Sequence, residues 1–327
     1  MSSTFEKKKK KKKKMKELSK NDSEENISEE MDKEENTNVK ELKSELAGET
    51  NNKGDNSGDI DKDNSGKNGD RGRQEDDPLF HIKSGLSQLE RTLSGEGYAF
   101  CNLICKEKNL GVIPKEMEKY VHLKYVNMSH NKIVDIENLY KLNNIIFLDL
   151  SYNLIKKLGN LKSIYLKNCL YMNMSYNLIK IVEDIKLKNI IEIDLSNNEI
   201  DNVNIYCSNS VKKLILSNNN IKNIHFKNIL TNLEFLDISS NPVENLQFYE
   251  ITPNINTLKI NNNCTLPINQ LCYLNNFKNL ENLDMENYLY FKDISYKEVK
   301  QILLQNSKDL NLIKFNGNRI LSKTTKS

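Results

Sequence analysis

The chain has 327 residues with 48 Lys and Arg against 45 Asp and Glu, giving a net charge of +3. This balance argues against a specific nucleic-acid partner, because nucleic-acid-binding domains concentrate positive charge on one surface. No apolar run is long enough to span a membrane, and the lysine-rich start lacks the apolar stretch of a secretory signal. We therefore expect an intracellular protein without a membrane anchor.

Residues 1–77 have the composition of a tail. Their one aromatic residue is Phe5, and Lys, Glu, Asp, Asn, Ser and Gly dominate the stretch. So few apolar side chains cannot offset the entropy lost on ordering, which predicts a disordered, charged, low-complexity segment. The run Lys7–Lys14 could contact acidic surfaces. The alternative, favoured by the acidic segment that follows, is a solvated tract without a selected role.

A helix is predicted over residues 78–97. Asp77 is a favourable N-cap and Pro78 a favourable first helical residue. Apolar residues then follow at helical spacing, and two glycines end the pattern; these residues are Leu79, Ile82, Leu86, Leu89, Leu93, Gly95 and Gly97. We expect this helix to cap the segment that follows.

One short phrase recurs through residues 98–292. It runs from Leu148 to Asn153 as Leu-Asp-Leu-Ser-Tyr-Asn and returns in similar form at Ile193, Leu214 and Leu236. The pattern L-x-x-L-x-L-x-x-N-x-L restarts every 21 to 25 residues, at Leu123, Ile145, Cys169, Ile190, Val211, Leu233, Ile255 and Leu280. This is the leucine-rich-repeat pattern, which predicts an α/β solenoid of about nine to ten stacked repeats with a curved parallel sheet.

The Asn of each repeat is expected to be structural. Its amide can donate to and accept from backbone groups that the tight turn leaves unpaired. The predicted Asn ladder consists of Asn131, Asn153, Asn177, Asn198, Asn219, Asn241, Asn263 and Asn318. Lys108 and Tyr288 occupy the same position in two further repeats, where the ladder is broken.

The end of the chain should cap the solenoid. Ser295 and Glu298 form the capping-box pattern that opens a helix. We expect a helix and a final repeat-like strand over residues 293–322, followed by a flexible tail at 323–327.

The side chains between the buried anchors should face the concave side of the sheet. The third repeat position there carries aromatics and the fifth carries acids and amides, while two tyrosines lie just beyond the strands. We predict that a protein partner binds this set: Tyr125, Asn127, Phe147, Asp149, Tyr152, Tyr171, Asn173, Tyr176, Asp194, Phe235 and Asp237. Aromatics beside carboxylates suit apolar and basic partner groups. The alternative is that these aromatics only pack on one another along the sheet.

No motif in the chain predicts catalysis or a cofactor. The phosphate-loop, dinucleotide, metalloprotease and nucleophile-elbow patterns are all missing from the sequence. The six cysteines have no paired zinc-ligand spacing, and Cys105 and Cys169 fall on buried repeat positions. We therefore expect no catalytic residues, no metal site and no cofactor.

The block before the second repeat goes beyond the general repeat pattern. It includes Gly85-Leu86, Gly97-Tyr98-Ala99 and Tyr120-x-His122-Leu123. In these residues the chain resembles the leucine-rich-repeat proteins of axonemal radial spokes. The resemblance implies a non-catalytic scaffold that joins spoke components in the axoneme of a motile flagellum, within the cytoskeleton.

Two other functions fit the same repeats. A cytosolic or nuclear regulatory subunit of a protein phosphatase would share the short repeats, the cap and the concave aromatics and acids. An RNA-splicing repeat protein would suit the lysine run but not the acidic concave positions. The block from Gly85 to Val126 favours the axonemal interpretation.

Overall fold

The computed structural model describes residues 77–319 except 93, 160, 292–294 and 307–311. The chain divides into two units, Met1–Gly66 and Lys67–Ser327, and all described residues lie in the second. Residues 1–76 of the tail predicted over 1–77, with its lysine run Lys7–Lys14, lie outside the described residues, as does the predicted flexible segment 323–327.

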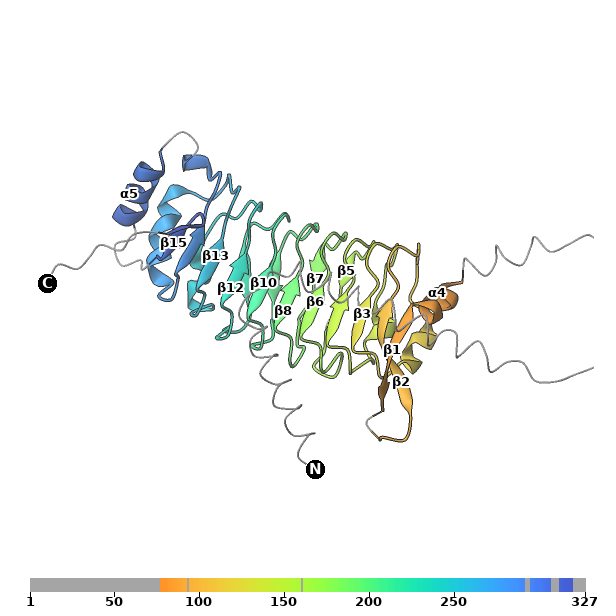
Figure 1. Cartoon of the computed structure of the whole chain (residues 1–327). Coiled ribbons are helices and arrows are strands. Elements are labelled where there is room, and N and C mark those ends of the chain that lie inside the picture. Colours follow the sequence, from red (N-terminus) through yellow and green to blue (C-terminus); the bar gives the residue numbers. More distant parts are fainter. Residues whose placement is uncertain (1–76, 93, 160, 292–294, 307–311, 320–327) are drawn as a thin grey trace, which may run out of the picture. The chain divides into compact units, whose positions relative to one another are not determined.

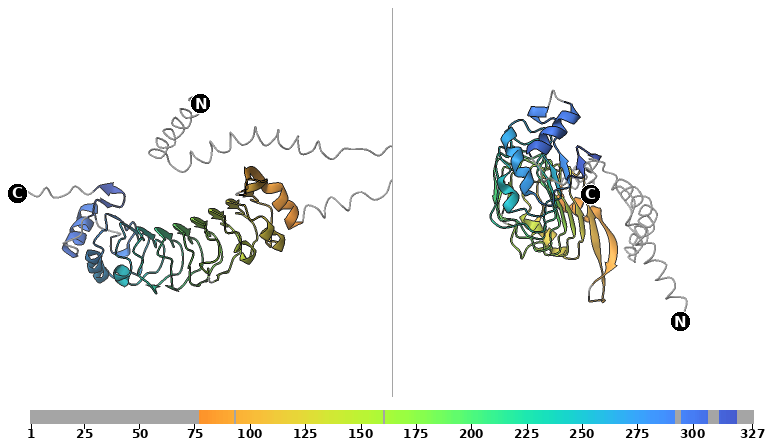
Figure 2. Two further views of the ribbon diagram at one scale, coloured as in Figure 1. Left: turned by 90° about the horizontal axis from the view of Figure 1, so that it is seen from below. Right: turned by 90° about the vertical axis from the view of Figure 1, so that its left-hand side faces the viewer.

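One twelve-stranded sheet runs the length of the described unit (Figure 1). The pairs at its two ends are antiparallel hairpins, and every pair between them is parallel. Figure 2 shows that this unit is curved, with the strands along its inner side. In sheet order the strands are β1 Leu86–Arg91, β2 Tyr98–Ile104, β3 Tyr125–Asn127, β4 Phe147–Asp149, β6 Tyr171–Asn173, β8 Glu192–Asp194, β10 Lys213–Ile215, β12 Phe235–Asp237, β13 Thr257–Lys259, β14 Asn282–Asp284, β15 Lys314–Phe315 and β16 Asn318–Arg319.

The short strands form because each repeat places one apolar side chain in the middle of three residues. Val126, Leu148 and Met172 are buried, while the residues before and after them face the concave side. Pairing aligns equivalent positions, as in Tyr125 opposite Phe147. One continuous apolar core results, and each buried anchor contributes roughly 1.5–3 kcal/mol.

The return segments of the repeats carry 3₁₀ helices and two small parallel sheets. The 3₁₀ helices are Lys115–Lys119, Glu137–Leu139, Gln247–Glu250, Ile268–Asn276 and Leu289–Phe291. The two-stranded sheets pair β5 Lys157–Leu158 with β7 Ile181–Val182, and β9 Val203–Ile205 with β11 Ile224–Phe226. These segments supply the remaining walls of the core.

The N-terminal cap differs from the predicted helix over 78–97. The helix α4 spans only Pro78–Gly85, with the Asp77 side chain accepting a bond from the Leu79 N–H at 3.0 Å. The chain then turns into β1, which pairs with β2 and satisfies backbone groups that would otherwise lie on an open sheet edge. Gly95 and Gly97 lie in the hairpin turn, where the Thr92 N–H donates to the Gly97 carbonyl. Residues Leu86–Arg91 therefore form a strand paired with β2, although the spacing of their leucines also fits a helix.

Gly85 marks the change from helix to strand. A Cβ atom at this position would lie 2.3 Å from the backbone oxygen of Ile104 in β2. Only glycine allows the helix to end this close to the strand it caps. Ile82, one turn earlier, is fully buried in the first repeat.

The C-terminal cap contains the predicted capping box. The helix α5 spans Tyr296–Asn306, and the Ser295 hydroxyl donates to the Glu298 carboxylate at 2.7 Å. The Glu298 carboxylate also accepts the Ser295 N–H, at 2.8 Å. The prediction of a helix there is confirmed.

The placement of Asn318 in the Asn ladder is wrong. Asn318 is exposed and begins β16, the return strand of a two-residue hairpin. Asn316 and Gly317 form the turn with φ of 48° and 72°, as tight hairpins require. Asn316 instead accepts the N–H of Met285 from the preceding repeat. Asn316 and Gly317 thus make a hairpin turn where the repeat pattern predicts another repeat turn.

We predict that Gly85→Ala destabilises the protein by about 1–3 kcal/mol, because the added methyl group must displace the backbone of β2. Equilibrium denaturation of the full chain measures the change. Gly111→Ala is the control, since a Cβ atom there meets no other atom within 4 Å. Equal stability of the two variants would show that the close approach at Gly85 is not a constraint.

Candidate protein-binding face

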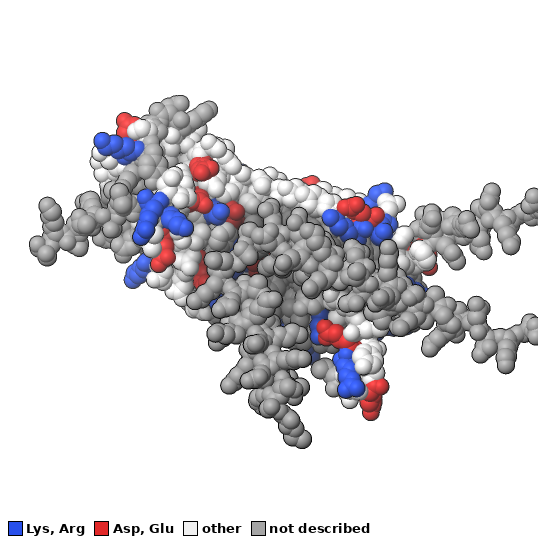
Figure 3. Space-filling view, viewed as in Figure 1, with Lys and Arg blue, Asp and Glu red and all other residues white. Residues whose placement is uncertain are grey.

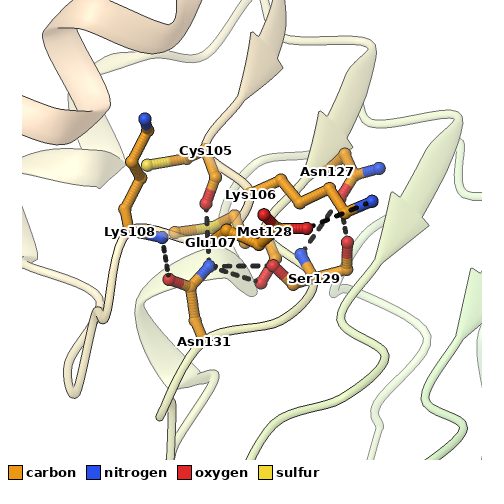
Figure 4. Close-up of polar contacts among 8 residues, drawn as sticks. All are labelled: Cys105, Lys106, Glu107, Lys108, Asn127, Met128, Ser129 and Asn131. Carbon is orange, nitrogen blue, oxygen red and sulfur yellow. Dashed lines mark hydrogen bonds and ion pairs between the residues drawn. The ribbon is translucent and has the colours of Figure 1, made fainter.

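Asn131 shows how each ladder residue holds two repeats together (Figure 4). Its side-chain amide donates to the carbonyls of Met128 and Ser129 in its own turn, at 2.9 and 3.1 Å, and to Cys105 in the previous repeat at 2.7 Å. Its oxygen accepts the N–H of Lys108 at 2.9 Å. One amide thus closes a turn and fixes the distance to the neighbouring turn.

The same arrangement recurs along the solenoid. At five further ladder positions, the amide donates to two carbonyls of its own turn and one of the previous repeat, and accepts an isoleucine N–H. These positions are Asn153, Asn177, Asn198, Asn219 and Asn241. All five are buried. The ladder therefore supports the concave strands from inside and does not itself face a partner.

The last two positions of the ladder, Asn263 and Tyr288, have different hydrogen-bond partners. Asn263 is fully buried, donates to the carbonyls of Asn241 and Val243, and accepts the N–H groups of Thr265 and Leu266. Tyr288 fills the next position, where its buried hydroxyl donates to the Leu266 carbonyl at 2.8 Å. Burial raises the pKa of Tyr288 well above its usual value, so the hydroxyl stays a donor.

A second, outer ladder was missed by the sequence analysis. The residue immediately before the first anchor of a repeat is often Asn, and its amide donates to a backbone carbonyl of the previous repeat. Examples are Asn144 to Val121 at 2.7 Å, Asn189 to Lys167 at 2.8 Å and Asn254 to Thr231 at 2.7 Å. The recurrence of Asn before Ile or Leu at these positions was the available sign. Concave strands such as β4 and β8 are therefore anchored at both ends.

Three predicted aromatic residues lie side by side on the concave face. Tyr125, Phe147 and Tyr171 occupy neighbouring strands in register and are 44%, 37% and 40% exposed. Ile104 at the end of β2 adds another exposed apolar side chain. We call Tyr125, Phe147 and Tyr171 the aromatic row.

Phe235 does not join the aromatic row. Two strands, β8 and β10, separate it from Tyr171. The ammonium groups of Lys213 and Lys259 lie 5.5 and 5.7 Å from its ring centroid. Phe235 therefore belongs to a separate, cationic part of the face.

The acids and amides of the fifth position have a structural task that the sequence analysis did not foresee. Asp149, Asp194 and Asp237 each accept the N–H of the serine two residues later, at 2.9, 2.8 and 3.0 Å. Asn127 and Asn173 do the same for Ser129 and Ser175, both at 3.0 Å. Each such side chain ends its strand by capping the turn.

The charges of the concave face divide into a paired and an unpaired group. Lys213 lies 2.8 Å from the Glu192 carboxylate, and Lys259 lies 3.4 Å from that of Asp284. Within the described residues, Asp149, Asp194 and Asp237 take part in no ion pair. On other parts of the described surface, Lys and Arg lie close to Asp and Glu (Figure 3). Negative charge therefore remains available beside the aromatic row.

Tyr152 and Tyr176 form a stacked column at the rim with His130, which the sequence analysis missed. The rings of His130 and Tyr152 are 4.2 Å apart and those of Tyr152 and Tyr176 are 4.1 Å apart, with interplanar angles of 9° and 7°. All three residues have positive φ, between 53° and 55°. Asn197 fills the equivalent turn position in the next repeat, as favoured there. His130 immediately precedes a ladder Asn, as both tyrosines do, and that was the available sign.

The two cysteines at buried repeat positions lie inside the core. Cys105 and Cys169 are buried, and desolvation raises the pKa of their thiols to about 11 and about 12. Among the residues that the structure describes, no group of three or more His, Cys, Asp or Glu side chains could hold a metal ion. No helix of the described part is long and apolar enough to cross a membrane.

The comparison with known proteins agrees with the repeat geometry. No protein-family model matches the chain. A segment of 75 residues, 23% of the chain, is 33% identical to the bovine (Bos taurus) leucine-rich repeat-containing protein 23. The fold is a leucine-rich-repeat solenoid. The match covers only 22% of the length of that bovine relative.

Solved structures with a similar chain trace are also known. Internalin C2 of Listeria monocytogenes is 24% identical, with 61% of this chain and 82% of that chain covered and a TM-score of 0.44. In the TLR13–ssRNA13 complex the identity is 20%, the coverage 72% and 38%, and the TM-score 0.48. A leucine-rich-repeat protein of Leptospira interrogans is 21% identical, with coverage of 62% and 46% and a TM-score of 0.38.

We predict that Asn198→Ala lowers the free energy of unfolding by about 1–3 kcal/mol, because it leaves buried carbonyls and the Ile179 N–H without their partner. The control is Asn220→Ala at a nearby exposed position. Denaturant unfolding followed by circular dichroism compares the two. An unchanged midpoint for Asn198→Ala would mean that the ladder does not stabilise the solenoid.

Proposed function

We propose that this leucine-rich-repeat protein is a non-catalytic scaffold that binds a protein partner on its concave face, over β3, β4 and β6. The observation that carries the proposal is the aromatic row, whose three large rings lie next to one another and are each more than a third exposed. Contiguous exposed apolar surface on a soluble domain is typical of an interaction site. Aromatic residues also contribute strongly to protein–protein binding energies.

The fold supports this role because the strands hold the row rigidly. The Asn ladder follows all three strands of the row, and β4 is also anchored at its other end by Asn144. Little side-chain or backbone ordering then opposes binding. Solenoids commonly use such extended concave surfaces for partners.

We further propose that the partner is a component of the axonemal radial spoke. The support is the resemblance of the block from Gly85 to Val126 to the spoke family. This block forms the end of α4, the β1–β2 hairpin and the first repeat turn, with Gly85 required by its contact with Ile104. A cap of this kind is more specific than a repeat pattern. Because the chain covers 22% of the bovine relative, the relative adds no partner or location to this support.

A regulatory subunit of a protein phosphatase is the second candidate. It is favoured by the unpaired carboxylates of Asp149 and Asp194 beside exposed aromatics, since a partner with basic and apolar groups would fit both. The two candidates differ in the cell. A tagged full chain in the axoneme with spoke proteins supports the first, whereas a nuclear signal with a phosphatase catalytic subunit would reject it in favour of the second.

We predict that Tyr125→Ala combined with Phe147→Ala abolishes partner capture and leaves the melting temperature nearly unchanged, because both side chains project from the sheet. Affinity capture from flagellated cells and thermal unfolding measure the two effects. Tyr206→Ala, a change of an exposed tyrosine outside the row, is the control and should change neither partner capture nor the melting temperature. Loss of stability without loss of capture would show that the row is structural.

A further inference from the structure

We propose that the concave face recognises an extended polyproline-II segment with a basic residue at every third position. The inference rests on the proposed scaffold function and adds the shape and charge of the partner. It comes from the spacing of the unpaired acids and from the position of Asp149 beside the aromatic row.

The fifth repeat position alternates along the sheet. Asp149, Asp194 and Asp237 lie on β4, β8 and β12, and the strands between them carry Asn173 and Ile215. Neighbouring strands are about 4.8 Å apart, so successive acids are separated by about 9.6 Å and the outer two by about 19 Å. The acids therefore form a regular series along the concave face, one on every second strand.

The available carboxylate oxygens point to a cationic partner. One oxygen of each acid accepts the serine N–H that caps the turn, which holds the side chain in place. In the described part of the chain no Lys or Arg pairs with these three acids. Arg or Lys side chains of a bound segment could pair with the second oxygen of each carboxylate.

The period selects the conformation of the partner. Polyproline II rises about 3.1 Å per residue and repeats every three residues, so six residues advance about 18.6 Å and return to the same face. In an α-helix, side chains seven residues apart are about 10.5 Å apart, and fourteen residues advance about 21 Å. A β-strand turns its side chains over after three residues. Polyproline II therefore matches the 19 Å series best.

The aromatic row supplies the apolar half of the site. Phe147 is two residues before Asp149 on the same face of β4, and Tyr125 and Tyr171 flank it on β3 and β6. Proline-rich segments bind through grooves lined by aromatic rings in this way. The prolines between the basic residues would pack on the row while the basic residues reach the acids.

The fit is strongest at the amino-terminal end of the series. Asp237 follows Phe235, whose ring is flanked by Lys213 and Lys259, so a partner's cation meets repulsion there. Asp284 would continue the alternation on β14, but it is already paired with Lys259. We therefore expect Asp149 and Asp194 to contribute more than Asp237.

The test uses the full chain and three fluorescent peptides of equal charge. One has the repeat Pro-Pro-Arg, one has the same composition in scrambled order, and one forms a helix with Arg every seven residues. Anisotropy titrations should show the first bound most tightly, with affinity falling as salt concentration rises. Equal affinity for all three peptides would overturn the inference.

The variant Asp149→Asn with Asp194→Asn removes charge and keeps the turn caps, because Asn127 and Asn173 already perform that task. We expect about tenfold weaker binding of the Pro-Pro-Arg peptide and an unchanged melting temperature. Asp284→Asn, at the paired site, is the matched control and should bind normally. Unchanged affinity of the double variant contradicts the proposal.

The outcomes separate this inference from the proposed function. If Tyr125 and Phe147 are needed for partner capture but no periodic peptide binds, the conformation proposed for the partner is wrong and the scaffold function stands. If capture also survives loss of the aromatic row, both proposals fail.

Discussion

The structure depends on the fact that no repeat can bury its own apolar strand. Each turn leaves backbone groups unpaired inside the solenoid. Each ladder amide donates hydrogen bonds to carbonyls of its own turn and to a carbonyl of the preceding repeat. Apolar burial and amide bonding therefore both require a neighbour. The two ends need separate solutions, which are the α4 and β1 cap at one end and α5 with the β15–β16 hairpin at the other.

This stacking also determines how the surface is built. Equivalent repeat positions pair in register on neighbouring strands. The side chains at one repeat position therefore form a row along the concave face. The third position gives the aromatic row, and the fifth gives acids that both cap turns and face outward. Asn or Asp can perform the capping, so the charge of that row can vary without loss of the fold.

Regular features could be predicted from the sequence because they recur with the repeat. The buried anchors, the ladder from Asn131 to Asn241 and the Ser295–Glu298 capping box all depend on local patterns. The strand Leu86–Arg91 could not, since its leucines also fit a helix and only the open edge of β2 decides between them. The predicted ladder position of Asn318 was wrong for a related reason, because Asn316-Gly317 makes a hairpin turn where the pattern predicts a repeat turn. The stacked column of His130, Tyr152 and Tyr176 could not be predicted either, because the sequence does not say which side chains the turns bring together.

We propose that the partner lies against the amino-terminal half of the concave face, where the aromatic row is. Hydroxyl-radical footprinting of the full chain, alone and in its isolated native complex, reports directly on exposed aromatic side chains. We predict protection of Tyr125, Phe147 and Tyr171 in the complex, with Tyr206 and Tyr290 modified as in the free chain. Unchanged modification of the aromatic row, with protection elsewhere on the solenoid, would show that the partner binds another surface.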